Sequence, residues 1–180
     1  LAFFLIPTYC FAQVEWAPVG AKWWYEQTYV SPVGSSYDIG YYNMEVIGDT
    51  IVLGRTCREL SWEENGQYCY TCDHRPYYVY SDSGRVYYFN HDDEAFTLLY
   101  DMNKGIGESW EVNFFNEYMN DDVTLTMTVI DTMSIWVNGV RLRQQKVDYH
   151  SQFSFGDVIT EGLGSTEAFF PNCQNGGGCE

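Results

Sequence analysis

Basic residues and long apolar runs are both scarce in this chain of 180 residues. Lysine and arginine together number 9 against 25 acidic residues, which gives a formal net charge of −16. Surfaces that bind nucleic acid or anionic membranes need clustered lysine and arginine, so this balance argues against both kinds of partner. The sequence holds no run of roughly 18 apolar residues, which excludes a membrane-spanning helix.

Sustained helical periodicity is also lacking. No segment repeats apolar residues at the spacing of an amphipathic helix, whereas aromatic residues, which favour strands, make up 18% of the chain. Because short strand patterns recur between turn signals, we expect one all-β domain over residues 13–171, an antiparallel barrel or sandwich of short strands with little helix. The expected strands lie near residues 41–47, 51–60, 77–80, 85–90, 95–100, 110–115, 123–129 and 157–161.

Two segments carry the clearest local signals. Apolar residues alternate with threonines from Val123 to Val129, which predicts a half-buried strand with its threonines toward solvent. Further along, the Asn-Gly pair at 138–139 suits a type I′ turn, in which both central residues have positive φ. We therefore expect a hairpin over 135–142, in which Ile135 faces Leu142.

Clusters of glycine, aspartate and serine mark the remaining turns. We expect turns at 48–50, 81–84 and 104–107. The segments 46–50 and 129–132 have similar sequences, which we interpret as two similar strand ends rather than as a repeat.

The two ends of the chain differ from its middle. Residues 1–12 are apolar and uncharged and end in Ala12 before Gln13, which predicts the remnant of a secretory signal peptide; a buried N-terminal strand is the alternative. Residues 172–180 form a loop rich in glycine and cysteine without a strand pattern. We expect that the chain is truncated there, before the rest of the protein.

Cysteine usage fits an oxidising compartment. With Cys10 assigned to the leader, an odd number remains, namely Cys57, Cys69, Cys72, Cys173 and Cys179. The C-x-x-C at 69–72 would also suit zinc or redox chemistry, but no second ligand pair and no following helix accompany it. We therefore expect structural disulfides, with Cys57 joined to Cys69 or Cys72 and Cys173 joined to Cys179, and the sequence leaves the pairing open.

Tryptophans are the candidate binding residues. A flat aromatic ring exposed on a sheet or loop can stack on a sugar or on another apolar ligand face. The candidates are Trp16, Trp23, Trp24 and Trp62. The alternative for each ring is a place in the core or at a sheet edge. If the rings are exposed, the expected partner is a cell-surface glycan or protein.

Histidine and carboxylate residues supply weaker candidates. Asp92, Asp93 and Glu94 follow His91 and could ligate calcium or place that histidine beside a carboxylate as a general base. Successive strand residues point to opposite faces, so a solvated loop is the simpler interpretation. Glu161 is the carboxylate to test for hydrolysis, although a hydrogen bond from turn amides to its side chain is the favoured interpretation. The sequence predicts no catalytic residue and no cofactor other than calcium at these carboxylates.

Several segments resemble a group of secreted Bacteroidota proteins. The first is Trp16–Tyr25, which is similar to the mature N-terminal signature of that group. The other matching segments are 48–54, 84–88, 98–102 with 107–109, and 161–166. The matching segments follow one another in the same order as in that group, and the resemblance covers most of residues 14–171. Met102 and Glu108 stand where the group has phenylalanine and aspartate.

This resemblance implies a secreted or cell-surface protein that continues into a C-terminal type IX secretion sorting domain. The group brings no established activity, so no catalytic residue carries over. We therefore expect a non-catalytic β domain with a structural or interaction role. The first alternative is a module that binds a glycan or small ligand through exposed aromatic residues. The second, which is less favoured, is a hydrolase built around Glu161 or His91.

Overall fold

The computed structural model describes residues 15–30, 37–65, 76–116, 121–149, 153–170 and 172–173, and these residues form strands and turns without a helix. The prediction of an all-β chain is therefore confirmed. The strands are β1 (Lys22–Val30), β2 (Tyr37–Val52), β3 (Arg55–Asn65), β4 (Tyr77–Asp82), β5 (Arg85–Asn90), β6 (Ala95–Asp101), β7 (Ser109–Asn116), β8 (Asp121–Val137), β9 (Val140–Asp148), β10 (Phe153–Ser154), β11 (Val158–Thr160), β12 (Gly164–Ser165) and β13 (Asn172–Cys173). The predicted leader remnant and most of the predicted C-terminal loop lie outside the described residues.

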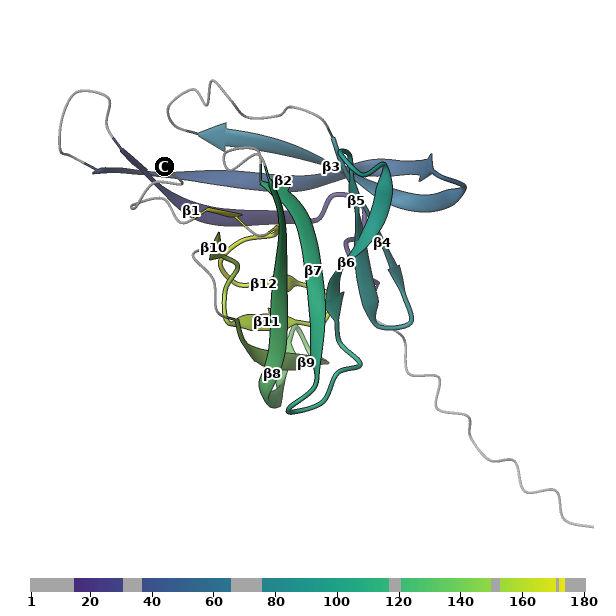
Figure 1. The fold of residues 1–180 in the computed structure, drawn as a ribbon, viewed down its shortest axis with the longest axis vertical. Helices are drawn as coiled ribbons and strands as arrows, with labels where there is room; N and C mark the ends of the chain where they lie inside the picture. Colours follow the sequence, from purple (N-terminus) through teal and green to yellow (C-terminus); the bar gives the residue numbers. More distant parts are fainter. Residues whose placement is uncertain are drawn as a thin grey trace, which may run out of the picture.

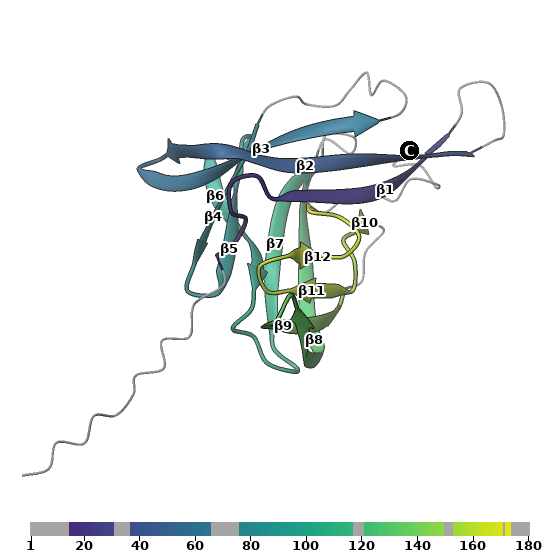
Figure 2. The same ribbon diagram turned by 180° about the vertical axis from the view of Figure 1, so that it is seen from behind.

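Antiparallel pairing in chain order builds two curled sheets. Sheet A has the order β1-β2-β3-β4-β5-β6, and sheet B has the order β12-β11-β9-β8-β7. The short strands β10 and β13 pair separately. Figures 1 and 2 show the two sheets facing one another, with the chain passing from β6 in sheet A to β7 in sheet B. The result is an antiparallel barrel-like or sandwich-like arrangement, as predicted.

Both sheets begin on the same plan. In each, a tight turn containing a glycine at positive φ precedes a strand that pairs with a much longer one. Gly20 has φ +85° and donates its N–H to the carbonyl of Val46 at 2.8 Å. Gly107 has φ +84° and donates its N–H to the carbonyl of Val129, also at 2.8 Å. The long strands β2 and β8 therefore occupy equivalent places in the two sheets.

Bulges bend the two long strands at these equivalent places. The register shifts between Val46 and Gly48 in β2 and between Val129 and Asp131 in β8. The predicted turn at 48–50 and the two predicted strand ends are wrong, because the chain continues as a strand through both segments. An extra residue on one strand of an antiparallel pair increases the local twist, so the bulges favour the curl of both sheets.

Turn chemistry explains which hairpins were predicted correctly. The β2–β3 turn lies at Leu53 (φ 48°) and Gly54 (φ 77°), later than expected, because leucine rarely adopts a left-handed backbone and so gives no turn signal. The β8–β9 hairpin forms with the predicted register around Asn138 (φ 50°) and Gly139 (φ 78°). The turn predicted at 81–84 also forms, between β4 and β5.

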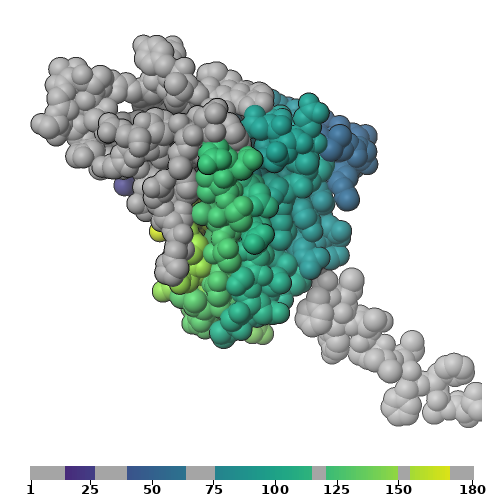
Figure 3. Space-filling view, viewed as in Figure 1, coloured from purple at the N-terminus to yellow at the C-terminus, as the bar shows by residue number. Residues whose placement is uncertain are grey.

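The hydrophobic core lies between the two sheets. In β8, Leu125, Met127 and Val129 are buried, whereas Thr124 and Thr126 are exposed, so the predicted alternation is confirmed. Residues of β2, β3, β4 and β6 close the other side of the same core. In the view of Figure 3, β7 and β8 form one continuous face with the neighbouring strands of sheet A.

Side chains join the first strand of sheet A to the last strands of sheet B. The indole Nε1 of Trp23 donates to the carbonyl of Leu163 at 2.7 Å, and the Tyr25 hydroxyl donates to the carbonyl of Ser165 at 3.4 Å. The Tyr100 hydroxyl donates to the carbonyl of Phe169 at 2.7 Å. These contacts hold the segment around β12 against sheet A.

Candidate functional site

The four candidate tryptophans divide into buried and exposed rings. Trp16 is 8% exposed and belongs to the core, while Trp23 and Trp62 are partly buried against it. Trp24, at 60% exposure, points away from the core. The alternation of side chains along β1 separates Trp23 from Trp24, because neighbouring strand residues face opposite sides of a sheet. Of the four predicted ligand-binding residues, Trp24 is the one whose ring is available to a ligand.

Trp24 and Tyr41 form an exposed pair on the outer side of β1 and β2. Their ring centroids are 5.3 Å apart with planes tilted by 60°, and Tyr41 is 38% exposed. Asn43 lies opposite Trp24 in the register, and the ion pair of Lys22 with Glu45, at 2.7 Å, follows on the same side. Asn43 is buried at 6% exposure, so of these groups a sugar could reach the Tyr41 ring and the Lys22–Glu45 ion pair beside the indole face. We call this surface the Trp24–Tyr41 pair.

A second aromatic surface, which the sequence analysis missed, covers the outer side of β4, β5 and β6. We call it the aromatic ladder; its half-buried rings are Tyr78, Tyr80, Tyr87, Phe89 and Phe96. The alternation of Tyr78 with Tyr80 and of Tyr87 with Phe89 would have placed these rings on one face of the predicted strands.

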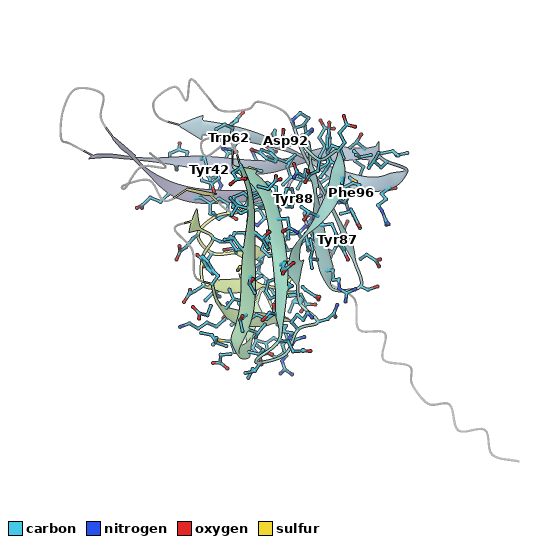
Figure 4. The ribbon with its side chains drawn as sticks, in the orientation of Figure 1. Tyr42, Trp62, Tyr87, Tyr88, Asp92 and Phe96 are labelled. Carbon is cyan, nitrogen blue, oxygen red and sulfur yellow. The ribbon has the colours of Figure 1, made fainter. Side chains whose placement is uncertain are left out.

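Ring contacts make the aromatic ladder continuous. Tyr80 and Tyr87 stack with centroids 4.8 Å apart, and Phe96 meets Tyr80 edge-on at the same distance. The Arg55 guanidinium lies 4.9 Å from the centroid of Tyr80, a cation–π contact. Figure 4 shows Tyr87 and Phe96 on the outside, away from the core residue Tyr42. The rings mainly cover one another, so the aromatic ladder is a packed surface rather than an open groove.

His91 is held by structural contacts. Its Nε2 lies 2.9 Å from the carbonyl oxygen of Pro76. Its ring packs against Tyr78 and Phe89, with centroid distances of 5.7 and 5.0 Å. The imidazole is thus engaged by a backbone carbonyl and by two aromatic rings. The arrangement therefore anchors the end of β5 to the start of β4.

The acidic run after His91 forms a turn between β5 and β6. Asp93 accepts a hydrogen bond from the Asn90 side-chain amide at 2.7 Å, and the N–H of Asp92 donates to the Asn90 oxygen at 3.0 Å. Glu94 has φ 50°, which closes the turn. Within the described ranges, no group of three or more histidine, cysteine, aspartate or glutamate residues is placed to hold a metal ion. The calcium site stays a prediction.

Glu161 continues the pairing of β11 with β9. Its Oε2 accepts a hydrogen bond from the N–H of Arg143 at 3.1 Å, and its own N–H donates to the carbonyl of Arg143 at 2.8 Å. The carboxylate thus accepts the hydrogen bond of a β9 amide that lies just beyond Gln144 and Thr160, the last paired residues of β9 and β11. This geometry gives Glu161 a structural use.

Cys57 is a buried free thiol in β3. It is 1% exposed, and its Sγ donates to the carbonyl of Arg55 at 3.4 Å. Burial raises the pKa of the thiol above its ordinary value, which disfavours the reactive thiolate. Cys69, Cys72 and Cys179 lie outside the described residues, as does the side chain of Cys173. The predicted disulfides therefore stay predictions.

Comparison with known proteins identifies no similar protein. No protein-family model, no curated protein and no solved structure matches the chain. Across the described part of the chain, no helix has the length and apolar character needed to cross a membrane.

Proposed function

We propose that this chain is a secreted or cell-surface β domain of a type IX secretion cargo-like protein, with a non-catalytic role in structure or interaction. The distribution of side chains is the observation that supports this proposal most directly. Glu161 and His91 bond to backbone groups in separate elements, whereas aromatic rings cover the outer side of sheet A. An acid–base centre needs its groups within hydrogen-bond reach of one reacting atom.

Hydrolysis assays test the non-catalytic role. We expect that nitrophenyl esters and glycosides are turned over no faster by the wild type than by Glu161→Gln or His91→Gln. Turnover that disappears in Glu161→Gln, while the melting temperature of that variant is unchanged, would contradict the proposal. The secretion route has its own test: protein recovered from the culture medium should begin at Gln13 when its N-terminus is sequenced.

Glycan binding is the second candidate function, and the Trp24–Tyr41 pair favours it. The Trp24 indole is 60% exposed beside the Tyr41 ring, and stacking on a sugar is a common use of such an exposed aromatic pair. The partner would be a cell-surface glycan that lays one apolar sugar face on Trp24.

Acrylamide quenching of tryptophan fluorescence tests this second candidate. Oligosaccharides of glucose, xylose and N-acetylglucosamine are the probes. We expect at least one probe to reduce quenching in the wild type and in Trp136→Ser, but not in Trp24→Ser. Trp136 is the matched control, because it is 72% exposed and belongs to β8 in the other sheet. Quenching that no probe changes would rule the candidate out for these sugars.

A further inference from the structure

Carboxylates flank the Trp24–Tyr41 pair on the outer side of sheet A. In the register of β1, β2 and β3, Trp24 lies opposite Asn43, and Asn43 lies opposite Glu63. Residues that lie opposite one another in a sheet share a face, so Glu63 is on the same side as the Trp24 indole. Glu26 shares this side as well, because it lies two residues beyond Trp24 along β1.

These two carboxylates are open to solvent. Glu26 and Glu63 are both exposed, and neither forms an ion pair with a basic residue that the structure describes. Glu45 differs from them, because the ammonium of Lys22 neutralises it at 2.7 Å. The exposed indole is therefore bordered by two carboxylates that keep their charge available to a ligand.

Electrostatics decides which sugars this surface suits. The potential of a chain with a net charge of −16 repels uronic acids and sulfated sugars, and it attracts cations. A neutral sugar would stack on Trp24 but leave both carboxylates without a partner. An amino sugar, which carries an ammonium in place of one hydroxyl, keeps its apolar face for stacking and brings a positive charge to the carboxylates.

The spacing of the sheet allows both contacts with one stacked sugar. Neighbouring strands lie about 4.8 Å apart, so the backbones of Trp24 and Glu63 are separated by roughly 10 Å. Asn43, at 6% exposure, fills the place between them and supports the sugar rather than contacting it. An amine at the rim of a sugar on Trp24 also lies within the roughly 6 Å over which an indole face attracts a cation.

We propose that the Trp24–Tyr41 pair binds an amino sugar whose amine is free, that is, a glucosamine-type unit of a glycan. The apolar face of the sugar stacks on Trp24, and its ammonium pairs with Glu63, while the charge of Glu26 adds to the attraction. The inference rests on glycan binding, the second candidate function, and names the class of sugar that is bound.

The indole N–H resonance of Trp24, assigned by its loss in Trp24→Ser, provides the readout. The probes are glucosamine, glucose and N-acetylglucosamine oligomers of equal length and linkage, at about pH 6, where the sugar amine is protonated. Glucose has a hydroxyl in place of the amine, and N-acetylglucosamine has the nitrogen without the charge. We expect the glucosamine oligomer to bind roughly tenfold more tightly than the glucose oligomer at low salt. This preference should shrink in about 1 M NaCl.

Two substitutions locate the ammonium. Glu63→Gln and Glu26→Gln should each reduce the preference for glucosamine over glucose by roughly two- to fivefold, the effect of one exposed ion pair. Glu111→Gln is the matched control, because it removes an exposed carboxylate from β7 in the other sheet, and it should keep the preference. An oligolysine of equal charge is the control for charge without a sugar face, and it should leave the Trp24 resonance in place.

Four results would overturn the proposal. They are a glucose oligomer that binds as tightly as the glucosamine oligomer, a preference that survives in both Glu63→Gln and Glu26→Gln, an equal loss in Glu111→Gln, and an oligolysine that shifts the Trp24 resonance equally. If the neutral oligomers still shift this resonance, glycan binding stands and the preference for an amine alone fails. If no oligomer shifts it, both fail, and the non-catalytic role is still tested separately by the hydrolysis assays.

Discussion

Gly164, in β12, lies against two buried rings of the core. Its φ is +82°, and a Cβ added there would be 3.1 Å from Cη2 of Trp16 and 3.3 Å from the hydroxyl of Tyr100. Both neighbours are buried ring systems that have little room to move. Gly164 is therefore required for two reasons, its backbone conformation and the space it leaves.

We predict that Gly164→Ala lowers the free energy of unfolding by about 2–4 kcal/mol, the sum of left-handed strain and overpacking. Gly54→Ala is the control, since Gly54 has φ +77° with open space around it, and it should cost about 1–2 kcal/mol. Urea denaturation followed by fluorescence measures both variants. Equal losses in the two variants would mean that crowding by Trp16 and Tyr100 contributes nothing.

The tryptophans show how far a single residue can be interpreted from sequence. That Trp23 and Trp24 face opposite sides follows from strand geometry alone. Which of them faces the core depends on sheet A packing against sheet B, and no local pattern records that. Trp16 is harder still, because it enters the core from a segment before β1. Residue type predicted aromatic candidates, whereas exposure, which decides binding, required the tertiary structure.

Side chains of β9 hold the connection between β6 and β7 through hydrogen bonds. Arg143, on β9, donates to the carbonyls of Met102 and Lys104 in this connection. Gln145, two residues further along β9, donates to the carbonyls of Asp101 and Lys104 at 3.1 and 2.8 Å. Since β6 belongs to sheet A and β9 to sheet B, these bonds fix the two sheets at their crossing point.

We predict that Arg143→Met lowers the free energy of unfolding by about 2–3 kcal/mol, because hydrogen bonds from a charged donor are lost while the alkyl chain is kept. Arg141→Met is the matched control on the same strand: Arg141 is exposed, and its loss should change stability by less than about 0.5 kcal/mol. Chemical denaturation compares them. A similar effect in both variants would show that charge, rather than the bonds to the connection, determines the result.

Element boundaries could be predicted where the residue types of a turn favour one particular backbone geometry. Asn138-Gly139 specifies positive φ at both positions, and that hairpin formed in the predicted register. The segment 48–50 has turn composition but lies inside β2, because the bulge after Val46 absorbs the irregularity without reversing the chain. Composition cannot separate a bulge from a turn, since both favour glycine and aspartate. Pairing with neighbouring strands makes the difference.

At the scale of the whole molecule, equivalent strands of the two sheets have diverged at their ends. Sheet B extends the pairing of β9 with β11 through Glu161, and Arg143 occupies the adjoining space. Sheet A stops the pairing of β3 with β4 at Arg58 and leaves a pocket. Equivalent bulges in β2 and β8 favour the curl of both sheets. The sheets differ at the ends of these pairings, where the Arg143 side chain occupies the space in sheet B and a pocket remains in sheet A.

The core contains an unusual number of buried tyrosines, and they link stability to alkaline pH. Burial is the main cause that raises the pKa of Tyr25, Tyr42, Tyr88 and Tyr100 well above the ordinary value near 10. The folded state therefore keeps these phenols protonated at a pH where the unfolded chain releases their protons. Stability falls whenever the unfolded state binds fewer protons than the folded state, so it should decrease as the pH rises above 10.

We predict a slope of about 1.4 kcal/mol per pH unit for each such tyrosine, or roughly 5 kcal/mol per pH unit for the four together, between about pH 10 and pH 12. Urea denaturation across this range measures the slope, and tyrosinate absorbance should rise in step with unfolding rather than before it. Tyr100→Phe removes one titrating group and should reduce the slope by about a quarter. Tyrosinate that forms in the folded state without loss of structure would show instead that these phenols reach solvent.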